Sequence, residues 1–233
     1  MSWLEAELQE QPAALARLID KQAGRAREIA EMFSRDDVQY VLIASRGSSG
    51  NAARYAQYVL GRAHRVPVMF ATPSLYTIYE QPPRLDGAVV VGISQSGASP
   101  DVASVLAEAR RQGRPTVALT NALDSRLARE ADAVLLLEAG EERAVAATKT
   151  YLNSLGAIAM LFAAVDGPVA EAERYSLDTS AIIACFTDEA GADRLEGCSA
   201  LRRGDASRPT RRLAEAVLAG RGARPARARS PER

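Results

Sequence analysis

The fold of this chain is decided by residues 40–51, which read YVLIASRGSSGN. The apolar run Tyr40–Ala44 is followed at once by a loop rich in Gly and Ser. A short apolar run that ends at turn residues is typical of a strand buried on both faces. The stretch therefore predicts the first strand-to-helix unit of a parallel sheet.

The same rhythm continues along the chain. Four more apolar runs rich in Val, Ile and Leu follow, at Val66–Phe70, Ala88–Ile93, Thr116–Leu119 and Ala133–Leu137. Helical patterns separate the runs, at residues 50–62, 100–112 and 123–130. Strand–helix alternation indicates right-handed βαβ units. We predict an α/β fold, with a five-stranded parallel doubly wound sheet in an αβα sandwich.

Helical patterns also flank the predicted sheet. Residues 2–34 predict N-terminal helices, with a break at Gln11-Pro12 where Pro12 starts the second helix. Residues 143–166 predict a longer helix, which Gly167-Pro168 ends.

The formal net charge of zero, from 29 basic and 29 acidic residues, hides an asymmetry. Residues 194–233 carry 11 Arg, no Lys and 4 acidic residues, a net charge of +7, so residues 1–193 carry −7. No aromatic residue follows Phe186. A segment so poor in large apolar residues cannot offset its ordering entropy. The sequence therefore predicts an irregular C-terminal tail.

Composition argues against several classes of protein. No run of about 20 apolar residues exists, so no membrane span is expected, and the acidic N-terminus does not resemble an export signal. Two cysteines, Cys185 and Cys198, cannot build a disulfide framework or a zinc cluster, which favours a reducing cytoplasm. The single His64 argues against a His-based metal site, and no cofactor is expected.

Ligands of open α/β sheets bind beyond the carboxyl ends of the strands, where three loops of this chain stand out. The first follows Tyr40–Ala44 and contains Gly47, Ser48 and Ser49, a pattern suited to an anion cradle at a helix N-terminus. The alternative is a plain strand-to-helix turn. A dinucleotide site is disfavoured, because the loop reads G-x-x-G and no acidic residue ends the second predicted strand.

The second loop, residues 94–101, reads SQSGASPD. Its neutral donors Ser94, Gln95, Ser96 and Ser99 could hold a phosphate without help from Arg or Lys, which the loop lacks. Alternatively Ser99 is only a helix N-cap, followed by Pro100 at the first helical position.

The third loop, residues 140–150, brings two ionisable groups, Glu142 and Lys149, near the same edge. Lys149 is one of only two lysines in the chain. The alternative is an exposed helix start with ordinary surface charges.

These three motifs together resemble the SIS (sugar isomerase) domain family over residues 10–166. They are most similar to the double-SIS group, which includes the isomerase half of glutamine–fructose-6-phosphate transaminase, glucosamine-6-phosphate deaminases and phosphosugar deglycases. The resemblance implies a phosphosugar ligand. Its phosphate would be held by Ser94, Gln95, Ser96 and Ser99, and its sugar and phosphate would be lined by Gly47, Ser48, Ser49 and Lys149.

The resemblance also implies how the sugar is held. Val145 and Ala147 would contact it through the backbone. Arg46 and Ala147 stand where the transaminase branch has a cysteine and a serine, and both departures favour the deaminase-like members.

The chemistry implied is proton transfer through an enediol or enolamine, with a carboxylate as base. In the double-SIS group this carboxylate comes from a second SIS copy, and no second copy is recognisable after residue 175. Glu142 is the substitute base within the matched region.

The resemblance implies three regions. They are a helical arm (1–36), a SIS phosphosugar-binding domain (37–166) and a tail with a missing or scrambled second SIS domain (167–233). The tail is either an altered reading frame or the basic tail of a true single-SIS protein.

Two functions stay open: an aldose–ketose phosphosugar isomerase or amino-sugar-phosphate deaminase, and a non-catalytic sensor or catalytically incomplete member. We expect a phosphorylated sugar or amino sugar as ligand and a homodimer as the assembly. Nucleic-acid binding by the tail is disfavoured, because no aromatic residues are interleaved with its arginines.

Overall fold

The computed structural model describes residues 2–166, apart from the side chains of residues 62–64, 162 and 166. The predicted irregular tail and altered second domain, with Cys185 and Cys198, lie outside the described residues, as does the side chain of His64. Within residues 2–166, no helix combines the length and the hydropathy that a membrane crossing requires. The same residues contain no group of three His, Cys, Asp or Glu side chains placed to hold a metal ion.

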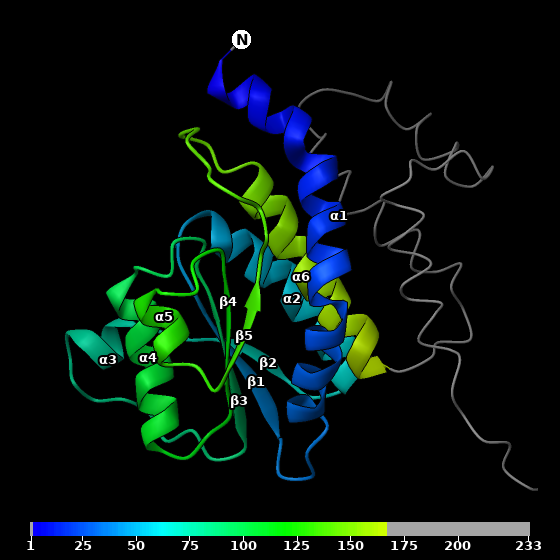
Figure 1. Cartoon of the computed structure of the whole chain (residues 1–233). Helices are drawn as coiled ribbons and strands as arrows, with labels where there is room; N and C mark the ends of the chain where they lie inside the picture. Colours follow the sequence, from blue (N-terminus) through cyan, green and yellow to red (C-terminus); the bar gives the residue numbers. More distant parts are fainter. Residues whose placement is uncertain (1, 167–233) are drawn as a thin grey trace, which may run out of the picture. The chain divides into compact units, whose positions relative to one another are not determined.

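Five parallel strands form one sheet in the order β2-β1-β3-β4-β5 (Figure 1). Their bounds are β1 Tyr40–Ser45, β2 Val68–Phe70, β3 Ala88–Ile93, β4 Thr116–Thr120 and β5 Ala133–Leu136. Ile43 of β1 lies opposite Phe70 on one side and Val91 on the other. Every residue of the central strand β3 is buried, as expected for a parallel sheet that is covered on both faces. The predicted five-stranded parallel sheet is confirmed.

Helices cover both faces of the sheet, which makes the predicted αβα sandwich (Figure 1). On one face lie α1 (Trp3–Ala30), α2 (Ser48–His64) and α6 (Lys149–Asp166). On the other lie α3 (Ser74–Thr77), α4 (Pro100–Arg111) and α5 (Arg126–Arg129). A 3-10 turn, Glu31–Phe33, follows α1.

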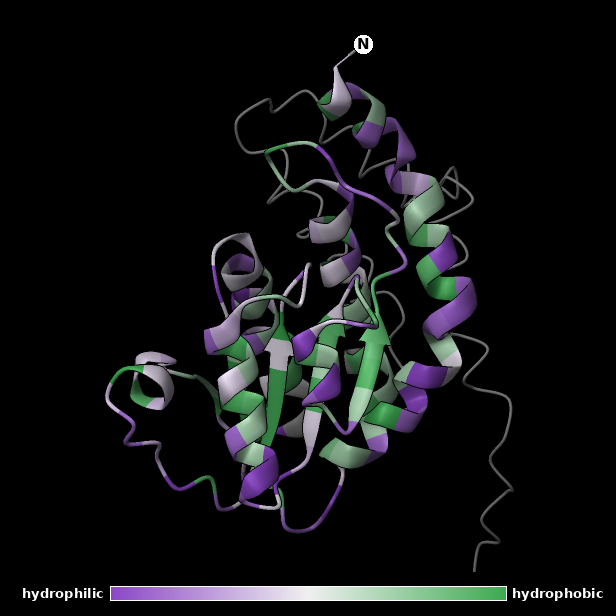
Figure 2. Ribbon diagram, turned by 60° about the vertical axis from the view of Figure 1, so that its left-hand side comes forward, coloured by the Kyte–Doolittle hydropathy of each residue, from purple (hydrophilic) through white to green (hydrophobic). Residues whose placement is uncertain are grey.

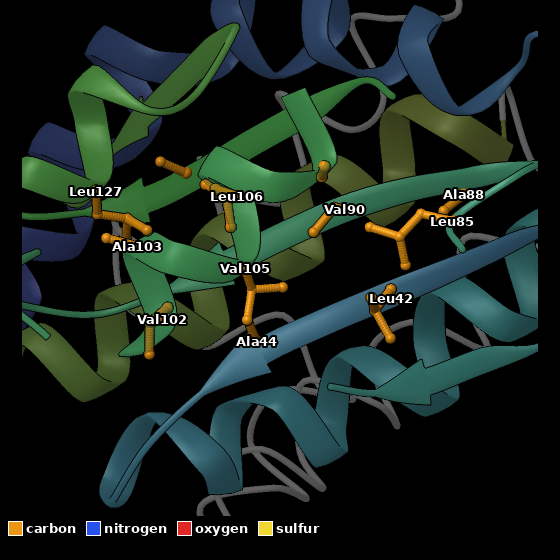
Figure 3. Close-up of a cluster of buried hydrophobic side chains, with 12 residues drawn as sticks. Leu42, Ala44, Leu85, Ala88, Val90, Val102, Ala103, Val105, Leu106 and Leu127 are labelled. Atoms are coloured by element: carbon orange, nitrogen blue, oxygen red, sulfur yellow. The ribbon is translucent and has the colours of Figure 1, made fainter. Parts of the chain in front are cut away.

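Apolar side chains fill the space between the sheet and α4. Val102, Val105 and Leu106 of α4 pack against Leu42 and Val90 of the sheet in one buried cluster (Figure 3). The strands are almost wholly hydrophobic, whereas hydrophilic residues lie on the outward faces of the helices (Figure 2). The short apolar runs of the sequence therefore fix the interior.

The N-terminal arm differs from its prediction, because α1 is one continuous helix rather than two. Pro12 lies inside α1, although proline in a helix interior usually costs about 3 kcal/mol. Two features offset that cost. Ser2 caps the helix in a capping box with Glu5, and Ala14 and Leu18, which follow Pro12, are fully buried.

The last described helix is also shorter than predicted, since α6 begins at Lys149 and not at residue 143. Residues 143–148 form a loop whose backbone amides bond to acidic side chains instead of helix carbonyls. The apolar spacing of Val145 and Leu152 suggested a longer helix, but Val145 is fully exposed.

Candidate functional site

The strand order creates a topological switch point at the carboxyl edge of the sheet. From β1 the chain moves outward to β2 and then crosses back to β3 on the other side of β1. The loops after β1 and β3 therefore leave the sheet in opposite directions, and this switch point is where open α/β sheets bind ligands. The first two predicted loops are the ones that flank it.

The loop after β1 delivers its polar residues directly to a helix N-terminus. Gly47 is the N-cap of α2, and Ser48 and Ser49 are its first two residues. Gly47 and Ser48 are exposed, and Ser49 is half-buried. The free amides of the first helical turn carry a partial positive charge, so this end of α2 suits an anion.

The loop after β3 is anchored by hydrogen bonds to the end of β4, and Ser96 in it is exposed to solvent. The Ser94 amide donates to the Leu119 carbonyl at 3.1 Å, and the Gln95 carbonyl accepts from Asn121 N at 2.9 Å. Ser94 is buried, whereas Ser96 is exposed. The backbone of the loop is thus fixed by the end of β4, and Ser96 faces solvent.

Ser99 holds the predicted N-cap position of α4, and Pro100 is the first helical residue. The Ser99 side chain, however, makes no capping hydrogen bond. The reading of Ser99 as a helix cap alone is therefore incomplete, because its hydroxyl is not used by the helix that it precedes.

An ion pair joins the first two loops. The Arg46 guanidinium, after β1, contacts the Asp101 carboxylate in the first turn of α4. The Arg46 side chain is 65% exposed and that of Asp101 22%. The loop of residues 94–101 contains no cation of its own, but the fold places one beside it.

In the third loop, the Glu142 carboxylate accepts hydrogen bonds from residues just after it in the chain. Its carboxylate accepts from the Thr148 amide at 2.8 Å, from the Thr148 hydroxyl at 3.2 Å and from the Thr150 amide at 3.3 Å. The Thr150 hydroxyl also donates to it. Glu142 therefore satisfies the free amides at the start of α6, and it stays half-buried.

Lys149 is buried rather than exposed, with a relative accessibility of 2%. Its ammonium donates to Glu10 Oε2 of α1 and to the Glu141 carbonyl, both at 2.6 Å. The reading of this region as an exposed helix start does not hold for Lys149.

The loop as a whole is held by α1 and by the end of β4. The Asn121 side chain donates to the Gly140 carbonyl at 2.7 Å and accepts from Ala139 N at 3.0 Å. The Arg143 guanidinium donates to Glu141 at 2.6 Å, which lowers the pKa of that exposed carboxyl. These contacts run to α1, to Asn121 and within the loop, rather than to the two loops at the switch point.

Two groups of residues near the site escaped the sequence reasoning. Glu7 and Glu10 enter the prediction only as acidic N-terminal residues that do not resemble an export signal, and Asp101 stands at the end of the second loop without a predicted partner. A signal for Glu7 was present: it shares the helical stripe of Ala14 and Leu18, where an acidic residue is out of place unless it has a buried partner.

The similarity to known proteins lies in the region that contains these loops. Residues 36–164 match the SIS domain family. Glutamine–fructose-6-phosphate aminotransferase of Gluconobacter oxydans is 32% identical over 185 residues, which are 76% of this chain and 30% of that enzyme. The chain thus spans about a third of the length of the curated relative.

Solved structures agree. A candidate phosphosugar isomerase from Silicibacter pomeroyi superposes with a TM-score of 0.70 at 34% identity, over 76% of this chain and 54% of that one. The C-terminal domain of glucosamine-fructose-6-phosphate aminotransferase from Francisella tularensis gives a TM-score of 0.61 at 27% identity, over 71% of this chain and 47% of that one. By its sequence match and its fold, this chain belongs to the SIS domain family.

Proposed function

We propose that this chain binds a phosphorylated sugar or amino sugar at the switch point between β1 and β3. One observation carries the proposal: the N-termini of α2 and α4 flank the same switch point at the carboxyl edge of the sheet, and each has serine hydroxyls in its first turn or in the loop before it. Two converging helix N-termini and free hydroxyls suit a phosphate group. The names of the relatives, which concern fructose-6-phosphate and phosphosugars, support the same ligand class.

The phosphate is assigned to the loop after β3. Ser96 offers an exposed hydroxyl and Ser99 a hydroxyl free of capping, while Ser94 and Gln95 shape the floor of the loop. Gly47, Ser48 and Ser49 line the opposite side. Arg46 adds a cationic group beside this loop, and its guanidinium has five donors of which the Asp101 contact uses only part.

The sugar is assigned to the third loop, through the backbone of Val145 and Ala147. Lys149 was predicted among the ligand contacts, but its ammonium is engaged by Glu10 and Glu141. We therefore assign Lys149 a supporting place behind the loop, and the argument for it is given below.

The reaction proposed is an aldose–ketose isomerisation or an amino-sugar-phosphate deamination. Both begin when a base removes the proton beside the carbonyl or imine carbon, and both need a carboxylate within hydrogen-bond reach of that proton. Glu142 is the carboxylate we propose for this step. A metal or other cofactor has no part in the proposed step.

A second candidate is phosphosugar binding without turnover. It is favoured by the position of Glu142, whose carboxylate already accepts hydrogen bonds from Thr148 and Thr150. A base with its lone pairs so engaged must leave the helix start before it can take a substrate proton.

Further predictions remain part of the proposal. They are the division of the chain at residues 36 and 166, a homodimeric assembly and a cytoplasmic location.

The test is an assay of the full chain with glucosamine-6-phosphate, fructose-6-phosphate and glucose-6-phosphate, followed by NMR and by ammonia detection. Ammonia release indicates a deaminase, and interconversion without ammonia indicates an isomerase. A rise in the melting temperature without turnover indicates a binding protein. If none of the three sugars reacts or raises the melting temperature, the proposal is wrong.

A further inference from the structure

The first turns of α1 and the loop before α6 extend together beyond the sheet, as both views show (Figures 1 and 2). Hydrogen bonds between residues more than 130 positions apart in the chain join the two segments. The loop that would carry the backbone contacts to the sugar is thus built against α1.

The first contact is a buried carboxylate that binds backbone amides. Glu7 of α1 is only 3% exposed. Its Oε1 accepts from Arg143 N at 2.6 Å, and its two carboxylate oxygens accept from Ala144 N at 3.4 and 3.3 Å. An unpaired buried carboxylate would be costly, so these amides explain why the fold tolerates Glu7 on the apolar stripe of α1.

The second contact holds the other end of the loop. The Lys149 side chain, 3% exposed, pairs with Glu10, whose side chain is 55% exposed. The same ammonium donates to the Glu141 carbonyl. Loss of the carboxylate at Glu10 would leave a buried ammonium with an incomplete set of acceptors, which is unfavourable.

The Glu7 contacts hold Arg143 and Ala144 near the start of residues 142–147, and the Lys149 contacts hold the chain on both ends of this stretch. The Arg143 guanidinium also lies over the Trp3 ring, 4.7 Å from its centroid. Val145 is fully exposed between the two anchored ends. The backbone at the tip is therefore fixed in place while it remains open to a ligand.

We propose that Glu7, Glu10 and Lys149 are positioning residues, which hold the backbone of residues 143–147 in the geometry that binds the sugar. The inference rests on the proposed function and adds to it a working role for α1. A loop ordered before the ligand arrives loses less entropy on binding, so release of the loop lowers affinity even though none of these side chains touches the ligand.

The test compares Glu7→Gln with a matched control, Glu28→Gln. Glu28 lies on the same helix, where it pairs with Arg25 across exposed side chains. Two quantities are measured on the full chain: the dissociation constant for glucosamine-6-phosphate and the hydrogen-exchange rate of amides 143–147. We expect faster exchange and about tenfold weaker binding for Glu7→Gln, equal to about 1.4 kcal/mol, and no change for Glu28→Gln.

A second variant, Glu10→Gln, keeps the test decisive should Glu7→Gln fail to fold, because Glu10 is half exposed. We expect the same two changes for it. Faster loop exchange with wild-type affinity would overturn the positioning role alone. Wild-type protein that binds none of the three phosphosugars would overturn the proposed function, and the positioning role with it.

Discussion

Arg46, in the loop after β1, forms an ion pair with Asp101 in the first turn of α4. The pair spans the switch point of the sheet and joins the two loops that we assign to the phosphosugar. Because the Arg46 side chain is 65% exposed, the pair adds little to the stability of the fold. The pair matters because it holds the Arg46 guanidinium beside the loop that we assign to the phosphate.

Arg46→Ala is expected to weaken glucosamine-6-phosphate binding by about 10- to 100-fold, since a charge-assisted hydrogen bond to phosphate contributes on the order of 1.5–3 kcal/mol. Asp101→Asn, by contrast, leaves the guanidinium in place and removes a negative charge beside the phosphate, so affinity should stay equal or increase. Titration calorimetry measures both. Equal losses in the two variants would mean that the pair only tethers the loops.

Ser96→Ala tests the phosphate loop itself. Ser96 is exposed, and its hydroxyl accepts a long hydrogen bond of 3.3 Å from Ala98 N. We expect a change in stability within about 0.5 kcal/mol but a loss of about 1 kcal/mol in phosphosugar binding, or roughly fivefold. Ser104→Ala in α4, whose hydroxyl bonds to the Pro100 carbonyl, is the control. Unchanged ligand affinity in Ser96→Ala would count against the phosphate assignment.

Glu142→Gln separates the two roles of the third-loop carboxylate. Because the Glu142 carboxylate accepts hydrogen bonds from the amides at the start of α6, the substitution should lower the free energy of unfolding by about 1 kcal/mol. If Glu142 is also the base, the substitution should lower turnover by about 100-fold with little change in ligand affinity. Denaturant unfolding and turnover are measured on one preparation. Loss of stability with wild-type turnover would assign Glu142 to the helix start alone.

Gly97→Ala should destabilise the fold more than an ordinary glycine substitution. A β-carbon at Gly97, where φ is +60°, would overlap the Ser125 side chain and lie 2.9 Å from Thr120 Oγ1. Overpacking and strain together suggest about 3 kcal/mol. Gly113→Ala is the matched control, because Gly113 has a φ of +69° but nothing lies within 4 Å of its added β-carbon, so about 1 kcal/mol is expected. Equal melting temperatures for the two variants would refute the steric argument.

Tyr76→Phe should stabilise the protein. The Tyr76 hydroxyl is buried without a hydrogen-bond partner among the described residues, and its burial raises the pKa to about 12. Removing an unpaired buried hydroxyl is expected to add about 1 kcal/mol. Tyr58→Phe, at a side chain exposed by 79%, should change nothing.

The same residue predicts an alkaline loss of stability. The raised pKa means that the folded state keeps the phenol proton while the unfolded state, with a pKa near 10, releases it. The folded state therefore binds more protons between about pH 10 and pH 12, and stability falls as pH rises through that window. Unfolding curves at pH 9 and pH 11 should show a smaller loss in Tyr76→Phe than in wild type. An identical loss in both would assign the alkaline effect to other groups.

The strands were predictable because their signal is local. The apolar runs that form the inner strands β3 and β4 are buried at every strand residue, as a covered parallel sheet requires, whereas Met69 and Phe70 of the edge strand β2 are exposed. In each run, the apolar residues alone identify the strand. The same holds for the Gly- and Ser-rich loops, which follow their strands directly. Pro12 misled the prediction of α1, because the capping box before the proline and the buried residues after it outweigh its local preference.

The start of α6 could not be found from the sequence for a related reason. Residues 143–148 have a helical apolar spacing, but the amides of Arg143 and Ala144 bond to Glu7, which is 136 positions away in the chain. No local pattern reports a partner at that distance. The prediction of Lys149 as a ligand contact missed its burial for the same reason, since its partner Glu10 lies 139 positions away in the chain.

By itself the sequence determined the parallel sheet, the order of the three loops and the resemblance to the SIS family, because strand burial and loop composition are written in neighbouring residues. Only the tertiary structure decided which groups meet. The strand order brought Arg46 to Asp101 across the switch point, and the packing of α1 on α6 turned Glu7, Glu10 and Lys149 from scattered charges into the anchors of one loop. Long-range contacts of this kind depend on where the strands and helices are placed, and a one-dimensional pattern does not contain that placement.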